Sequence, residues 1–172
     1  MHHAILKGAI LALLLLSSSV VSAPATAETP LPEALAAPGE TIVLTAHAVG
    51  MQTYECKAGT DGKLAWAFRE PVATLIADDK IVGRHFAGPT WQLSDGSAVV
   101  GRVAASTPGA TANDIAWLKL DVVSRSGSGM LSNVTTVQRI NTVGGKLDDA
   151  CDRPGDGRSM PYTADYVFLR KG

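Results

Sequence analysis

The sequence predicts an all-β protein, a mainly antiparallel β-sandwich or barrel of about eight to ten strands that follows an N-terminal signal peptide. Short runs rich in β-branched and aromatic residues alternate with a period of two from residue 41 onward. Gly, Pro, Asp and Ser separate these runs so closely that no room remains for the crossover helices of a parallel sheet. No stretch after residue 41 has a sustained helical period.

Residues 1–27 have the features of an export signal. Lys7 precedes an apolar run over residues 9–16, and small residues with possible cleavage sites after Ala23 and Ala27 follow it. The apolar run is shorter than the about 20 residues that a membrane-spanning helix needs. We therefore expect export to the periplasm or the outside of the cell, with no membrane attachment after the signal is removed.

Residues 28–40 contain three prolines together with Ala and Glu, and they have no sustained period. This composition is typical of a flexible lead-in. Residues 41–172 are long enough for one hydrophobic core, so they are predicted to form a single β-rich domain.

The predicted strands follow one another along this domain. Asp95-Gly96 divides one long run at a position typical of a two-residue hairpin turn, and Asp61-Gly62 does the same before another run. The runs in chain order are TIVLTAHAV, MQTYECK, KLAWAFRE, DKIVGRHFAG, TWQLSDGSAVVGRVAAS, DIAWLKLDVVS, NVTTVQRINT and YTADYVFLRK.

Aromatic residues fall on these runs or at their ends, where they are expected to fill the core. Trp91 and Leu93 share one face of their strand because they are two residues apart, and so do Tyr166 and Phe168. The functional alternative is a platform on which exposed rings stack against a carbohydrate. By the same alternation, His85 is predicted to share a face with Ile81 and Ala87.

The charge balance disfavours nucleic acid as a partner. The full chain has a net charge of −1, and removal of the signal with its single Lys7 changes this to −2. Lys and Arg are scattered along the chain, whereas proteins that neutralise phosphates cluster them. The expected partner is therefore a small molecule, a glycan or another protein.

Cys56 and Cys151 are the only cysteines of the chain. An even cysteine number in an exported protein favours a disulfide, which would close a loop of about 95 residues. The alternative is a reactive or metal-binding thiol pair, but C-x-x-C spacing is absent. Asn133-Val134-Thr135 is a glycosylation sequon, which matters only in a eukaryotic secretory route.

Patterns for metal and cofactor chemistry are weak, so we expect neither a metal nor a cofactor. After signal removal only His47 and His85 remain, and neither has the spacing of a zinc-binding motif. The acidic segment LDDACDRPGDG lacks the ligand order of a calcium loop. The segment GSGMLS lacks the third glycine and the following helix of a dinucleotide site.

Several motifs resemble those of a known family. They are GMQTYECK, WAFREPVATL, GRHFAGPTWQLSDGSAVVGRV, IAWLKLDVVSRSGSGMLSNVTTVQRINTVGG and PYTADYVFL, in this order. Over about residues 40–169 the chain is similar to a family of exported bacterial and fungal proteins catalogued as domain of unknown function three-four-five-five. The resemblance implies a secreted β-rich domain and assigns no catalytic role to any residue.

Two functional hypotheses remain. The first is a non-catalytic binding module whose ligand lies near His85, Trp91 and Asn141, because polar groups on aromatic-rich strands are typical of a pocket. The second is a hydrolase or another acid/base enzyme that uses His85 with Asp95 or Glu55 as its partner. The second hypothesis predicts a cavity above the His85 ring and a carboxylate that shifts its pKa. A Ser97 nucleophile with His85 and Asp95 would lack the usual G-x-S-x-G elbow.

Overall fold

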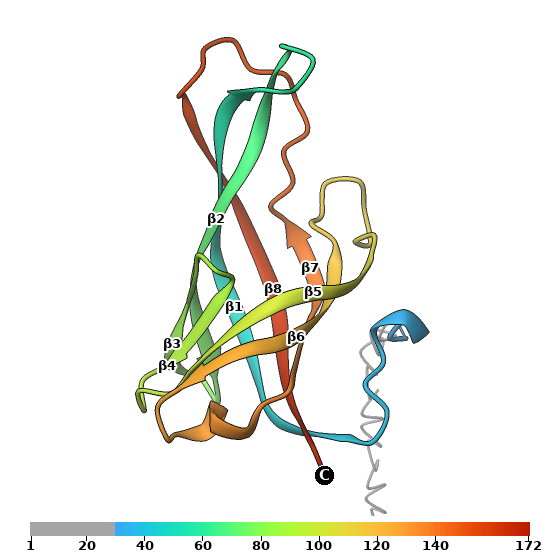
Figure 1. Cartoon of the computed structure of the whole chain (residues 1–172), viewed down its shortest axis with the longest axis vertical. Helices are drawn as coiled ribbons and strands as arrows, with labels where there is room; N and C mark the ends of the chain where they lie inside the picture. Colours follow the sequence, from blue (N-terminus) through green and yellow to red (C-terminus); the bar gives the residue numbers. More distant parts are fainter. Residues whose placement is uncertain (1–29) are drawn as a thin grey trace, which may run out of the picture. The chain divides into compact units, whose positions relative to one another are not determined.

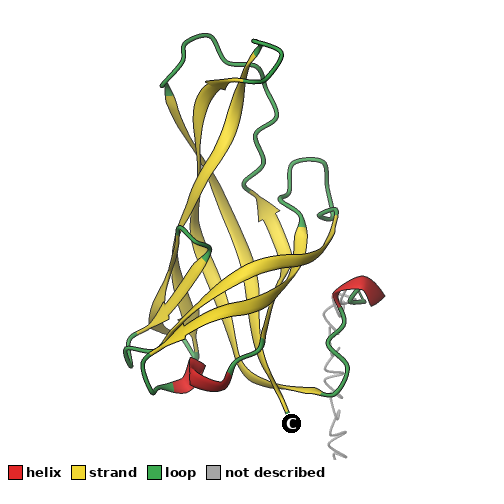
Figure 2. Cartoon of the chain, in the orientation of Figure 1, coloured by secondary structure: helices red, strands yellow, loops and turns green. Residues whose placement is uncertain are grey.

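In the computed structural model, which describes residues 30–172, eight antiparallel strands close into one barrel (Figures 1 and 2). Each strand pairs with its neighbours along the chain, and the first strand pairs with the last. The predicted all-β antiparallel class is thus confirmed, and the barrel is the correct one of the two architectures. The export signal predicted at residues 1–27 lies outside the described residues.

The barrel is built from strands of very different lengths. The strands are β1 (Glu40–Ala58), β2 (Leu64–Ala77), β3 (Lys80–Phe86), β4 (Thr90–Leu93), β5 (Ala98–Thr107), β6 (Trp117–Ser126), β7 (Thr136–Gly144) and β8 (Gly157–Lys171). Two short 3₁₀ turns, η1 (Glu33–Leu35) and η2 (Met130–Asn133), complete the secondary structure of the described part.

A disulfide links Cys56 and Cys151, whose Cα atoms lie 5.8 Å apart. Cys56 lies near the end of β1, and Cys151 lies in the long connection between β7 and β8. Figure 1 shows this connection beside the hairpin formed by β1 and β2. The bond therefore ties an extended loop to the distal end of the longest hairpin, and it confirms the predicted cysteine pair.

Hairpin turns lie at both predicted positions, but they are longer than the predicted two residues, because residues 94–97 connect β4 to β5 and residues 59–63 connect β1 to β2. Gly96 has a φ of 84° in the turn between β4 and β5, where the Leu93 N–H donates to the Ser97 carbonyl. Gly62 has a φ of 76° in the turn between β1 and β2. Glycine occupies both positions because a residue with a Cβ rarely adopts such angles.

Large and small residues alternate across the interior of the β1/β8 pair. Tyr166 lies opposite Ala46, and Tyr162 lies opposite Gly50. Both tyrosines are buried. A Cβ on Gly50 would lie 2.6 Å from that of Ala73, so glycine at this position lets β2 approach β1 closely. Trp91 and Leu93 are buried on one face of β4, as their spacing predicts.

The prediction that His85 and Ile81 share one face of their strand is wrong. His85 is 2% exposed, whereas Ile81 is 72% exposed. The pairing of β2 with β3 shifts between Leu75, which faces Gly83, and Ile76, which faces Ile81. Such a β-bulge places one extra residue on β3 and therefore reverses the alternation on either side of it.

Part of the segment predicted as a flexible lead-in packs on the barrel. The Leu35 side chain is fully buried, and its carbonyl accepts a hydrogen bond of 2.7 Å from Gln138 Nε2. Lys119 Nζ donates a bond of 3.0 Å to the Ala36 carbonyl. This contact explains why Gln138, on β7, is buried.

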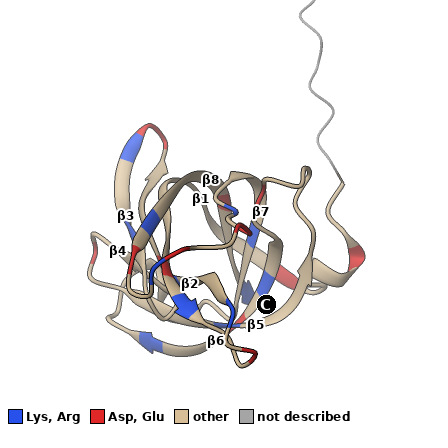
Figure 3. Cartoon of the chain, turned by 90° about the horizontal axis from the view of Figure 1, so that it is seen from above, with Lys and Arg blue, Asp and Glu red and all other residues tan. Residues whose placement is uncertain are grey.

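Charged residues are scattered over the strands and loops when the barrel is viewed from above (Figure 3). None of the helical segments within residues 30–172 has the length and hydropathy of a membrane-crossing helix.

Candidate functional site

The barrel contains a cavity of about 1020 Å³ that is open to solvent. Apolar side chains from β2, β5 and β6 form much of its wall, including Phe68, Val103, Leu118 and Leu120. The connection between β5 and β6 lines it as well, from Pro108 to Ala116. Polar side chains also line the cavity, and they come from five strands: Gln52, Tyr54, His85, Trp91, Arg139 and Tyr166.

His85 is held in this wall by β3 and β4. Its Nδ1 lies 2.8 Å from the Thr90 carbonyl, and its ring stacks on Trp91 with 4.5 Å between the centroids. Burial lowers the pKa of His85 from 6.5 to about 3, although the hydrogen bond to Thr90 opposes this change. The imidazole is therefore neutral at pH 7, so Nδ1–H donates to the carbonyl and Nε2 remains an acceptor.

Neither predicted carboxylate partner of His85 lines the cavity. Asp95 Oδ1 accepts hydrogen bonds from the backbone and hydroxyl of Ser97, and Asp95 Oδ2 accepts one from Met130 N–H. These bonds lower the pKa of Asp95 and assign its carboxylate to the β4–β5 turn. Glu55 pairs with Lys57 at 3.2 Å.

Trp91 is 1% exposed and forms the centre of an aromatic cluster in the cavity wall. Its ring centroid lies 5.3 Å from that of Tyr166 and 6.2 Å from that of Phe168, both in edge-to-face geometry. A Cβ on Gly101 would lie 3.0 Å from the indole, so glycine at this position lets Trp91 pack against β5. The indole Nε1–H has no hydrogen-bond partner among the described residues.

Arg139 is a cavity-lining residue that the sequence reasoning did not select. It lies on β7 between Leu118 of β6 and Tyr166 of β8, its partners in the sheet register. Its Nε donates a hydrogen bond of 3.0 Å to the Ala116 carbonyl. The sequence does contain a signal that Arg139 faces inward. Arg139 is two residues from the buried Val137 and therefore lies on the same face of the strand.

Two tyrosine hydroxyls near Arg139 stay protonated, that of the cavity-lining Tyr166 and that of Tyr162, which does not line the cavity. Burial raises the pKa of both Tyr162 and Tyr166, while the nearby Arg139 guanidinium opposes this rise. The two hydroxyls lie 3.4 Å apart. Gln52 approaches the Tyr162 hydroxyl and opposes the rise of the Tyr162 pKa. The Nε2 atom of Gln52 nevertheless has no hydrogen bond of good geometry. The Tyr54 hydroxyl donates to the Gly145 carbonyl at 2.7 Å.

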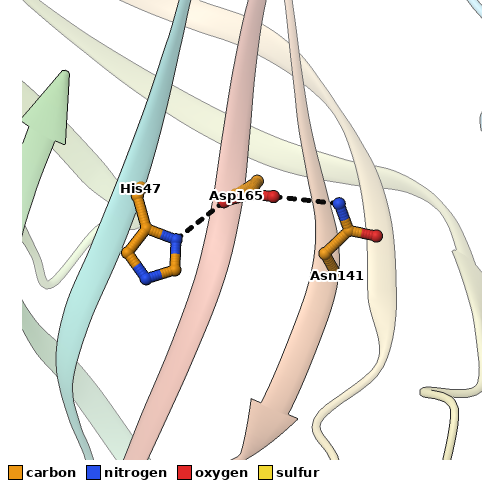
Figure 4. Close-up of polar contacts among 3 residues, drawn as sticks. All are labelled: His47, Asn141 and Asp165. Carbon is orange, nitrogen blue, oxygen red and sulfur yellow. Dashed lines mark hydrogen bonds and ion pairs between the residues drawn. The ribbon is translucent and has the colours of Figure 1, made fainter. Parts of the chain in front are cut away.

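Asn141 does not line the cavity. It is exposed at an irregular point of β7, where its φ is 51°. Figure 4 shows its Nδ2 donating to Asp165 Oδ2 at 2.9 Å, while His47 Nδ1 lies 2.8 Å from Asp165 Oδ1. The structure thus brings His85 and Trp91 together and places Asn141 in a separate surface cluster with His47 and Asp165.

Metal binding finds no support in the described part of the chain. Among residues 30–172, no group of three or more His, Cys, Asp or Glu side chains is placed to hold a metal ion.

A family model with the description "Protein of unknown function (DUF3455)" matches residues 37–170. The chain belongs to this family. The DUF3455 match extends over all eight strands except the last residue of β8, Lys171, and contains every residue that lines the cavity. No curated protein and no solved structure matches the chain significantly. The chemistry of the DUF3455 cavity must therefore be argued from its own residues.

Proposed function

We propose that this domain is a non-catalytic binding module that takes a small, largely apolar molecule into the barrel. The observation that carries the proposal is the cavity of about 1020 Å³, with apolar walls and a few convergent polar groups. Ligand sites in proteins commonly have volumes of about 300–1,000 Å³ and this kind of lining. Apolar wall that is left open to water lowers the stability of a barrel, so its presence favours a binding role.

The aromatic cluster supports a small ligand inside the barrel rather than a glycan on its surface. Trp91 and Tyr166 are buried behind the accessible part of the cavity wall, at 1% and 0% exposed, so they support the wall and do not form a surface platform. Phe68 is 54% exposed, but it also lines the cavity. A carbohydrate platform needs several rings exposed on one face.

The acid/base alternative has less support. A histidine with a pKa of about 3 is a poor general base, because efficient catalysis needs a pKa close to the working pH. The cavity above His85 that this hypothesis requires is present, but burial and not a carboxylate shifts the pKa. We therefore assign His85 to the wall of the binding site.

We further propose that the domain works in an oxidising compartment outside the cytosol. The disulfide between Cys56 and Cys151 supports this location, since such bonds persist mainly in exported proteins. The N-terminal pattern described above supports it independently.

Binding of the neutral fluorescent probe N-phenyl-1-naphthylamine tests the proposed function. We expect the fluorescence of the probe to increase in a saturable way as it binds, with the probe itself excited rather than the tryptophans of the protein. Leu118→Trp should weaken binding because it adds an indole to the cavity lining. Val123→Trp is the matched control, because it lies on the same strand and is 52% exposed outside the cavity.

Equal binding by both variants and the native protein would place the probe outside the barrel and contradict the proposal. Absence of binding to the native protein would contradict it as well.

A further inference from the structure

Arg139 differs from the other charged residues of the cavity because the described residues supply it with no counter-ion. No ion pair within residues 30–172 involves it. One of its N–H groups donates to the Ala116 carbonyl, which is neutral. Another N–H of the guanidinium approaches the Tyr166 hydroxyl, so at most three of the five donors are available to another acceptor.

The other charges of the lining already have partners. Arg69 Nε lies 3.5 Å from Glu70, and Lys146 Nζ lies 2.8 Å from Asp148. The Asp114 carboxylate accepts bonds from the Thr111 backbone and hydroxyl and from Gly144 N–H. The lining thus contains three cations and one occupied carboxylate, although the whole chain has a net charge of −1.

The groups near Arg139 do not neutralise it. Tyr166, its partner across the strand, is a protonated phenol, and the neighbouring His85 is neutral. A half-buried cation among neutral side chains is costly unless an anion joins it. A ligand that carries the anion would remove this cost.

Two other donors of the cavity wall lack acceptors. Trp91 Nε1–H and Gln52 Nε2–H are buried and have no partner among the described residues. An oxyanion is a group that only accepts hydrogen bonds, so it matches a wall with unused donors. Arginine is also the side chain best suited to bind two oxygens of one carboxylate or phosphate.

We propose that the ligand is a small amphiphile whose oxyanion head group, a carboxylate or a phosphate monoester, binds Arg139 while its hydrocarbon part contacts the apolar wall. This inference rests on the proposed function, because it specifies the ligand class of the same cavity. Leu118 lies beside this position and would contact the part of the ligand next to the head group.

The test is displacement of N-phenyl-1-naphthylamine by three matched compounds, namely decanoate, decyl phosphate and 1-decanol, each below its micelle concentration. The native protein should bind at least one of the two anions about tenfold or more tightly than the alcohol, as a charge-assisted pair predicts. The two anions distinguish a carboxylate from a phosphate head group.

Arg139→Gln should remove this preference and leave the affinity for 1-decanol within about threefold. Arg125→Gln is the matched control, because Arg125 also donates from Nε to a backbone carbonyl, that of Val134, but does not line the cavity. This variant should keep the preference for the anion. If Arg139→Gln does not fold, Arg139→Lys retains the charge and should retain part of the preference.

The outcomes separate this inference from the proposed function. Binding of N-phenyl-1-naphthylamine and 1-decanol without any preference for the anions in the native protein would overturn the inference and leave the proposed function standing. A preference that persists in Arg139→Gln would also overturn it. Absence of binding by every compound, the probe included, would overturn both.

Discussion

The imidazole of His85 lies parallel to the indole of Trp91, with 4.5 Å between the ring centroids and 8° between the ring planes. The two residues are direct partners in the register of β3 with β4. Tyr166 contacts both rings, at 4.9 Å from His85 and 5.3 Å from Trp91. These contacts join β3 and β4 to β8 across the barrel interior, so the wall of the cavity is also part of the core.

Replacement of His85 by Ala should destabilise the protein by about 2–4 kcal/mol. The variant loses the stacked pair and the hydrogen bond to Thr90, and it leaves an enlarged space beside Trp91. Urea unfolding followed by far-UV circular dichroism measures the change. His47→Ala should cost less than about 1 kcal/mol, because the His47 side chain is 49% exposed and its pair with Asp165 lies on the surface. Equal midpoints for the two variants would contradict the structural role of His85.

Stability should fall as the pH decreases below about 6.5 because of His85. An unfolded histidine binds a proton near pH 6.5, whereas folded His85 stays neutral until about pH 3. Unfolding therefore takes up a proton between these values, and the stability present above pH 6.5 is lost at up to about 1.4 kcal/mol per pH unit. Urea unfolding at about pH 7, 6 and 5 should show this loss in the native protein and a smaller one in His85→Gln. Parallel profiles of stability against pH for the two proteins would show that His85 does not cause this loss.

Removal of the disulfide should lower the free energy of unfolding by about 4 kcal/mol, because the bond closes a loop whose ends are 95 residues apart in sequence. Unfolding of the double variant Cys56→Ser/Cys151→Ser, compared with the native protein in urea, measures the loss. The native protein under reducing conditions should approach the variant. A thiol assay that detects two free sulfhydryls in the native protein without reductant would show that the pair is not bonded.

Asp95→Ala should destabilise the protein by about 1–2 kcal/mol, since it removes the acceptor of three hydrogen bonds, two from Ser97 within the β4–β5 turn and one from Met130 of η2. Asp61→Ala is the matched control in the β1–β2 turn, where the carboxylate accepts one backbone bond, from Lys63. Thermal unfolding of the two variants gives the comparison. A larger effect of the Asp61 change would mean that the Asp95 bonds do not stabilise the turn.

Alternation of residue types was sufficient to predict the fold class and part of the core. Trp91 with Leu93 and Tyr166 with Phe168 are buried because residues two apart share a face of a strand. The closure of the sheet was not predictable in the same way, because it depends on the pairing of β1 with β8, which are far apart in sequence. The bulge that separates His85 from Ile81 also depends on the partner strand and leaves no local pattern.

The candidate site was only partly accessible from sequence. His85 and Trp91 line the cavity, but Asn141 lies outside it with Asp165. Arg139 escaped attention because a charged residue on a strand is usually placed in solvent. Its spacing from Val137 was the available signal, although only the three-dimensional pairing with Leu118 and Tyr166 places it at a cavity.

A crystal structure of the protein grown with decanoate tests the central claim most directly. The account predicts density for the hydrocarbon chain in the cavity against Phe68 and Leu118, with the carboxylate within hydrogen-bond distance of Arg139. A barrel interior without ligand density, with decanoate bound only on the outer surface or not at all, would contradict it.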